Sequence, residues 1–122
     1  MKIRCVRQLD ERTGAQIERS TWLTVGAVYH VLEIVVSEVG TIKFRLLGDD
    51  KWTPALHLST QFELVSGLIP ACWAVQFGLD GSLKLAPNMW MDRGFWERYF
   101  DGSTRERQIF EDTYKAILTE EP

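Results

Sequence analysis

Few side chains in this chain of 122 residues have the type and spacing needed for chemistry. Its two histidines, His30 and His57, form neither a His-x-x-x-His nor a His-Glu-x-x-His spacing, so the sequence predicts no metal site. Its two cysteines, Cys5 and Cys72, are too few for a structural zinc ligand set. We expect both cysteines to pack as small hydrophobic residues and His30 to be a half-exposed strand residue. No cofactor is expected.

Two arrangements could still support catalysis. A Cys–His nucleophilic pair need not be close in sequence, so Cys72 could meet a histidine in the fold. Glu97 and Asp101 lie on one face of an expected helix, where paired carboxylates can divide acid and base roles. Arg93 and Arg98 are near enough to neutralise them, however. We therefore predict that the protein is not an enzyme. A small enzyme remains a lesser alternative, whose sign would be an apolar pocket in which Cys72 or Glu97 meets a histidine.

Tryptophans beside acidic residues form the strongest candidate for a binding site. The chain has five Trp, and Trp52 directly follows the cluster Asp49-Asp50-Lys51. Trp supplies large contact area in protein interfaces, while acidic residues steer a basic partner. Trp90 lies between two methionines and is expected to fill the core instead. The candidate partner-binding residues, which share predicted turns and loops, are Asp10, Glu11, Asp49, Asp50, Trp52 and Asp80.

The elements that must position these residues are mostly strands. Alternation of apolar and polar residues, with turn residues between the runs, predicts strands at 1–7, 24–36, 41–47, 52–59, 61–65, 72–78 and 82–86. Pro54 cannot donate a hydrogen bond to a neighbouring strand, so its strand is expected at an edge. Residues 8–21 are polar and show neither the alternation of a strand nor the periodicity of a helix. This pattern predicts a long exposed loop.

Two helices are expected after the strands. Phe95, Trp96, Tyr99 and Phe100 form an amphipathic stripe over two turns, which Asp101 and a glycine end. The sequence Ser-Thr-Arg-Glu at 103–106 is a capping box, and the helix after it keeps an apolar face to residue 118. The aromatic residues on periodic apolar faces, which we expect in the core, are Phe44, Phe62, Phe77, Phe95, Tyr99, Phe110 and Tyr114.

Strands followed by helices indicate a single domain of the α+β class over residues 1–122. We expect a strongly bent antiparallel sheet of five or six strands, or a partly open SH3-like barrel, closed at one side by the two C-terminal helices.

The charge distribution limits the kinds of partner. The formal net charge is −3 and the pI is near 5.4. Acids and bases balance over residues 1–100, and the whole excess of acids lies in 101–122. This balance argues against a nucleic-acid partner, which usually binds a basic surface. No apolar run has the length of a signal peptide or membrane span, so we expect a cytoplasmic protein with no membrane partner.

Two segments resemble the opening hairpin of SH3-like small β-barrels, LTVGAVYHVLEI at 23–34 and GTIKFRLLGDD at 40–50. Together with FELVSGLIPACWAVQF at 62–77, LKLAPNMW at 83–90 and GFWERYFDG at 94–102, they are similar to small immunity proteins encoded beside bacterial polymorphic or contact-dependent toxins. The resemblance spans about residues 23–118.

This resemblance implies a cytoplasmic protein that neutralises one cognate toxin by binding it, often over its active site. The mild charge differs from that of strongly acidic immunity proteins that mimic nucleic acid, which argues against a nuclease as the toxin. We expect the 8–21 loop together with Asp49, Asp50 and Trp52 to occlude the toxin. The first alternative is an SH3-like module that binds a peptide or single-stranded RNA through exposed aromatic residues.

Overall fold

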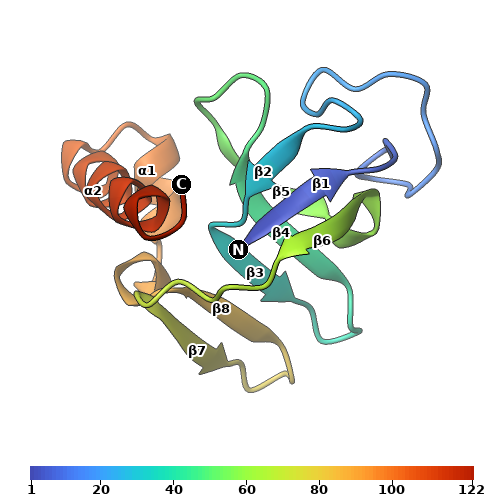
Figure 1. The fold of residues 1–122 in the computed structure, drawn as a ribbon. Coiled ribbons are helices and arrows are strands. Elements are labelled where there is room, and N and C mark those ends of the chain that lie inside the picture. Colours follow the sequence, from blue (N-terminus) through green and yellow to red (C-terminus); the bar gives the residue numbers. More distant parts are fainter.

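The computed structural model describes residues 1–122 as eight antiparallel strands in two sheets, followed by two α-helices (Figure 1). The strands are β1 Lys2–Cys5, β2 Val28–His30, β3 Glu33–Val36, β4 Ile42–Leu47, β5 Pro54–Leu58, β6 Phe62–Ser66, β7 Trp73–Phe77 and β8 Leu83–Pro87. The helices are α1 Phe95–Phe100 and α2 Thr104–Glu120, and short 3₁₀ turns cover Ser59–Gln61 and Asn88–Met91. The α+β class and the two C-terminal helices are therefore confirmed.

The two sheets share a core but do not close into a barrel. One sheet has three strands in the order β2-β1-β6, and the other has five in the order β5-β4-β3-β8-β7. Buried side chains of both sheets, among them Ile3, Cys5, Tyr29 and Leu46, form the core between them. The edge strands of the five-stranded sheet are thus β5 and β7. The eight strands exceed the five or six expected, because all seven alternating runs of the sequence form strands and the run at 24–36 is divided into two.

That division occurs at Val31 and Leu32, where the chain passes from one sheet to the other. Both residues are fully buried. The Val31 N–H donates to the Met1 carbonyl at 3.0 Å, whereas the Leu32 N–H donates to the Arg45 carbonyl on β4 at 2.8 Å. Val31 packs in the core between the sheets, and Leu32 packs in a second core against the helices. The side chains of these two consecutive residues point in opposite directions, as neighbours along an extended chain do. Both are buried because each side chain faces a different core.

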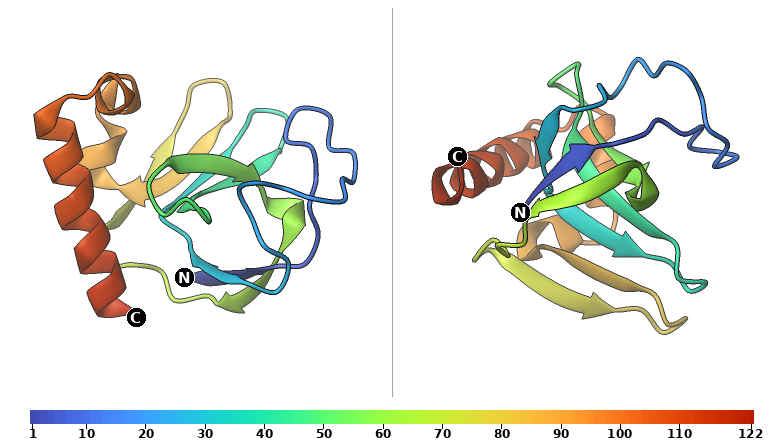
Figure 2. Two further views of the ribbon diagram at one scale, coloured as in Figure 1. Left: turned by 90° about the horizontal axis from the view of Figure 1, so that it is seen from above. Right: turned by 45° about the vertical axis from the view of Figure 1, so that its right-hand side comes forward.

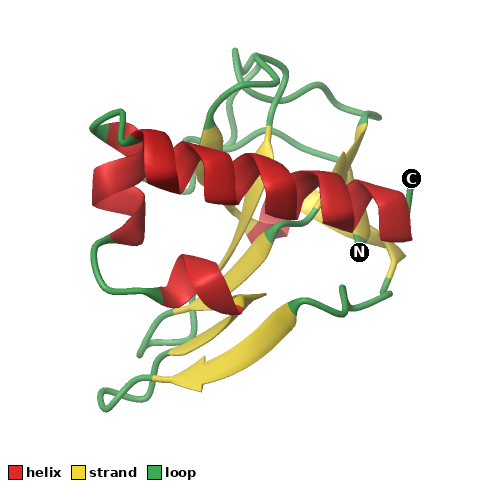
Figure 3. Cartoon of the chain, turned by 90° about the vertical axis from the view of Figure 1, so that its left-hand side faces the viewer, coloured by secondary structure: helices red, strands yellow, loops and turns green.

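The second core lies between the five-stranded sheet and the helices. Trp90 is 1% exposed and stacks on Phe110 with ring centroids 5.2 Å apart, so its predicted core position is confirmed. Figures 2 and 3 show α2 lying along one side of the strands. The helix starts where the capping box predicts, but the Ser103 hydroxyl bonds the buried Glu106 carboxylate rather than a backbone N–H.

A buried ion pair connects the sheet to this helical layer. Glu33 and Arg45 face each other across β3 and β4, and the Arg45 Nε donates to Glu33. Another Arg45 nitrogen donates to the Pro54 carbonyl at 2.7 Å. The Arg45 guanidinium also lies 3.9 Å from the ring centroid of Trp96 on α1, within the range of a cation–π contact. Arg45 therefore touches β3, β5 and α1 at once.

Two core predictions are wrong. Phe77 is 78% exposed, because β7 is an edge strand and no element covers the end of its apolar face. Cys72 is exposed in the turn before β7, whereas Cys5 is buried as expected. Apolar alternation identifies the inner face of a strand, but it does not show whether another element covers that face.

Candidate functional site

The turn between β4 and β5 presents Trp52 to solvent in a fixed position. The Asp50 Oδ1 accepts hydrogen bonds from the backbone N–H groups of Trp52 at 3.0 Å and Thr53 at 3.2 Å. These bonds lower the pKa of Asp50 and keep its carboxylate ionised, and the bond from the Trp52 N–H has the largest effect. Lys51 has a φ of 57°, in the left-handed region that tight turns use. Trp52 is 70% exposed, so it is not a core residue.

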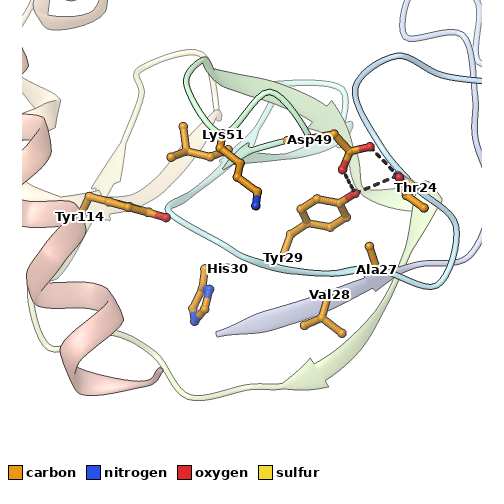
Figure 4. Close-up of a pocket in the computed structure, with 10 residues that line it drawn as sticks. Thr24, Ala27, Val28, Tyr29, His30, Asp49, Lys51 and Tyr114 are labelled. Atoms are coloured by element: carbon orange, nitrogen blue, oxygen red, sulfur yellow. Dashed lines mark hydrogen bonds between the residues drawn. The ribbon is translucent and has the colours of Figure 1, made fainter.

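Asp49, next to this turn, faces the protein instead. Its Oδ1 accepts a hydrogen bond from the Tyr29 hydroxyl at 2.7 Å, and its Oδ2 accepts one from the Thr24 hydroxyl at 2.6 Å. The Tyr29 oxygen in turn accepts the Thr24 N–H at 2.8 Å (Figure 4). Burial, with the Asp49 carboxylate, raises the pKa of Tyr29 to about 12, so this hydroxyl stays a donor. Asp49 therefore ties the turn to the segment before β2.

Two adjoining pockets lie between this turn, β2 and α2. The larger has a volume of about 630 Å³, and Figure 4 shows Lys51 and His30 beside it with Tyr114 of α2 at one end. The second, of about 310 Å³, shares Leu47, Lys51 and Tyr114 with the first. We call the two together the turn–helix groove, which is lined by Thr24, Ala27, Val28, Tyr29, His30, Leu47, Gly48, Asp49, Lys51, Trp52, Tyr99, Arg107, Phe110, Glu111 and Tyr114.

The 8–21 loop is confirmed as a loop without regular strands. Asp10 Oδ1 accepts the N–H groups of Arg12 at 2.9 Å and Thr13 at 3.0 Å, so Asp10 shapes the bend of the loop. The loop and Trp22 line a further pocket of about 450 Å³. Asp10 thus has a structural role in the loop, and it also lines this pocket.

Glu11 fastens this loop to β5. Its Oε1 bonds the His57 Nδ1 at 3.2 Å and accepts a hydrogen bond from Gln61 Nε2 at 2.6 Å. Its Oε2 accepts the Leu58 backbone N–H at 2.8 Å. His57 and Gln61 are both buried, so Glu11 is a structural acceptor for groups that lack contact with water. Only part of the Glu11 carboxylate faces solvent.

The structure places the candidate residues in three locations. Asp49, Asp50 and Trp52 share one turn, and Asp10 and Glu11 lie in the loop next to β5. Asp80 lies in the β7–β8 turn, where its Oδ1 accepts the Ser82 N–H at 2.9 Å. Because β5 and β7 are opposite edges of the sheet, Asp80 is apart from the rest (Figure 1).

Trp22 joins two of these locations and was missed in the sequence. It is 41% exposed, lines the pocket of the 8–21 loop and lies 6.2 Å from the His57 ring. Its carbonyl accepts the Asp49 backbone N–H at 2.8 Å, so it also contacts the β4–β5 turn. Its position at the end of a polar loop, outside any periodic apolar face, could have indicated in the sequence that Trp22 is exposed. An exposed Trp between two candidate segments extends the possible contact surface.

The catalytic alternatives find no support in the geometry. Cys5 Sγ bonds the Arg7 carbonyl, Cys72 lies near Glu120, and desolvation raises the pKa of both thiols. Glu97 and Asp101 are exposed at a helix end, as expected. No group of three or more His, Cys, Asp or Glu side chains is arranged to hold a metal ion. Neither helix combines the length and the apolar character that crossing a membrane requires.

No protein-family model matches the chain, and no curated protein or solved structure is significantly similar to it. The similarity to immunity proteins therefore stays a prediction.

Proposed function

We propose that this protein is a non-enzymatic binding module that acts as an immunity protein, neutralising a cognate toxin domain by covering it. The observation that carries the proposal is the exposed indole of Trp52 beside the turn–helix groove. Trp residues of this kind supply much of the binding energy in protein interfaces.

The turn that carries Trp52 is well suited to tight binding. The Asp50 carboxylate holds the backbone of the turn, and Asp49 fixes the turn to Tyr29. A side chain that is already in place loses less entropy when it binds. The neighbouring 8–21 loop and Trp22 extend the surface to one side, so a partner docked on Trp52 would also contact this loop. Asp80 lies on the opposite edge and is left out of the proposed surface.

Replacement of Trp52 tests the proposal directly. The probe is the toxin domain encoded by the adjacent reading frame, co-purified with the tagged protein and titrated by calorimetry. We expect Trp52→Ala to weaken binding by about 30-fold, which corresponds to roughly 2 kcal/mol for a central anchor. Thermal unfolding should be unchanged, because Trp52 is mostly exposed.

Val39→Ala is the matched control, since Val39 is 80% exposed on the distant β3–β4 turn. Unchanged toxin affinity of Trp52→Ala would remove the turn–helix groove from the proposal. Failure of the native protein to bind that domain or inhibit it would reject the immunity function itself.

One observation favours the second candidate, binding of a peptide or single-stranded RNA. Lys51 and Arg107 lie beside the aromatic residues of the groove, as an RNA site requires. Asp49 and Glu111 line the same groove and balance this charge. Retention on a polynucleotide resin that falls with salt, and that Lys51→Ala weakens, would favour RNA over the toxin.

A further inference from the structure

The outer edge of β7 differs from the other three sheet edges in having no protection against a further strand. β2 is only three residues long, β5 begins with Pro54, and β6 carries the charged Glu63 and pairs with β1 through an irregular register. Short length, proline, charge and irregular pairing are the devices by which proteins prevent edge-to-edge association. β7 has five residues, Trp-Ala-Val-Gln-Phe, without a charge or a proline.

The backbone of β7 offers free hydrogen-bonding groups along this edge. The Gly78 N–H bonds the Ser82 carbonyl at 2.9 Å, and β7 continues from there in regular antiparallel register with β8. Because hydrogen-bonded and non-hydrogen-bonded pairs alternate, Gln76 and Ala74 bond β8. The N–H and C=O groups of Val75 and Phe77 therefore point away from β8, to the open side.

The side chains at this edge continue an apolar surface of the sheet. Val75 is 55% exposed and Phe77 is 78% exposed. The strand register places them at the ends of two apolar rows, Phe77-Leu83-Val36-Ile42 and Val75-Leu85-Ile34-Phe44. Both rows are on the face that packs toward the three-stranded sheet, since Ile34 and Phe44 contact that core. The rows stop at β7 with uncovered side chains.

We propose that β7 pairs antiparallel with β7 of a second copy of this chain, about a two-fold axis at Gln76. In this register Val75 of each copy lies opposite Phe77 of the other. The four outward backbone groups of each strand then find partners, and the two five-stranded sheets form one continuous sheet. The Phe77 row of one copy continues into the Val75 row of the other.

A second copy fits this edge for reasons of charge and symmetry. β7 has no charged residue, so antiparallel pairing with itself brings no like charges together. The two apolar rows are self-complementary about the axis, as an isologous dimer requires. Leu79, fully exposed in the β7–β8 turn, would lie opposite Trp73 of the second copy. The proposal is independent of the toxin-binding function.

Sedimentation over a range of concentrations tests the proposal. We expect the native chain to sediment at twice its mass of 14.1 kDa and Phe77→Lys to sediment as a monomer. The lysine would put two like charges near the axis without disturbing a buried residue. The control is Val39→Lys in the β3–β4 turn, where the native side chain is about as exposed as that of Phe77; this variant should remain a dimer. A native monomer at every concentration, or a Phe77→Lys variant that stays dimeric, would overturn the proposal.

A cysteine at the axis tests the register. In a Cys72→Ser background, Gln76→Cys places the two new thiols in a non-hydrogen-bonded pair, where Cα atoms are about 4.5 Å apart and a disulfide can form. We expect a covalent dimer on mild oxidation. Glu38→Cys in the same background is the control and should stay monomeric on a denaturing gel. No cross-link through residue 76, or an equal one through residue 38, would contradict the proposed pairing.

Discussion

The two edges of the five-stranded sheet are built in opposite ways. At the β5 edge, Pro54 has no N–H, and the N–H of Leu58 is taken by Glu11 of the 8–21 loop. His57 on that strand is 3% exposed. At the β7 edge, Val75 and Phe77 are exposed, and their outward backbone groups have no partner in the chain. Part of the β5 edge is therefore covered within the monomer, whereas the β7 edge is available for association.

The difference shows where edge protection comes from in this fold. Glu11 is 47 residues before Leu58, so a loop from the N-terminal part of the chain covers the end of β5. No comparable segment reaches β7, because the residues after β8 turn away to form the helical layer (Figure 3). At β5, protection therefore comes from a distant loop as well as from Pro54 of the strand itself.

Removal of Glu11 should make the first edge resemble the second, with the largest effect on stability. Glu11→Ala leaves His57, Leu58 and Gln61 without their shared acceptor. An unsatisfied buried donor costs on the order of 1–3 kcal/mol, and water would replace part of the loss. We expect the free energy of unfolding, measured in urea, to fall by about 2–4 kcal/mol.

Glu18→Ala is the control, since Glu18 is an exposed residue of the same loop without a hydrogen-bonded side chain. It should leave the unfolding midpoint unchanged. A Glu11→Ala variant as stable as the native protein would show that the loop does not close the β5 edge.

Acid should weaken the attachment of the 8–21 loop to β5 through Glu11. Burial alone would raise the pKa of Glu11, but hydrogen bonds from His57, Leu58 and Gln61 outweigh it and lower the pKa below 4.5. A lowered folded pKa gives stability that is present above the unfolded pKa and lost as the pH falls through the folded pKa. Stability should thus decline below about pH 4.5, and less steeply in Glu11→Gln. Urea titrations between pH 7 and 3 measure the two slopes; equal slopes would contradict this role.

The smallest effect is expected from Phe77→Ser at the open edge. Phe77 is 78% exposed, and exposed substitutions usually change stability by less than about 0.5 kcal/mol. The measurement is urea unfolding at low protein concentration, where a dimer would dissociate. A loss as large as that of Glu11→Ala would mean that the β7 edge is closed within the monomer after all.

Local patterns in the sequence predicted the elements well. All eight strands and both helices lie within or close to the expected ranges, because alternation and helical periodicity are local properties. The exposed position of Trp52 and the buried one of Trp90 also followed from their neighbours. The start of α2 agrees with the capping box, although Ser103 bonds the Glu106 side chain.

Pairings between distant residues were beyond local patterns. The sequence did not predict that Glu33 and Arg45 would form a buried pair, because this depends on the β3–β4 register and on Trp96 above it. The role of Glu11 was missed for the same reason. It was expected on a binding surface as an acidic loop residue, but His57 and Gln61 hold its carboxylate inward. A carboxylate can serve a partner or a buried donor, and only the fold shows which.

The opposite positions of β5 and β7 in the sheet have a consequence for valency. In the proposed dimer, the two β5 edges and their neighbouring Trp52 turns would lie at the two ends of the joined sheet, roughly 40 Å apart for flat strands at ordinary spacing. One dimer would therefore carry two copies of the turn–helix groove, one toward each end of the joined sheet. A partner that carries two binding domains would be held with avidity, provided that their spacing matched this span.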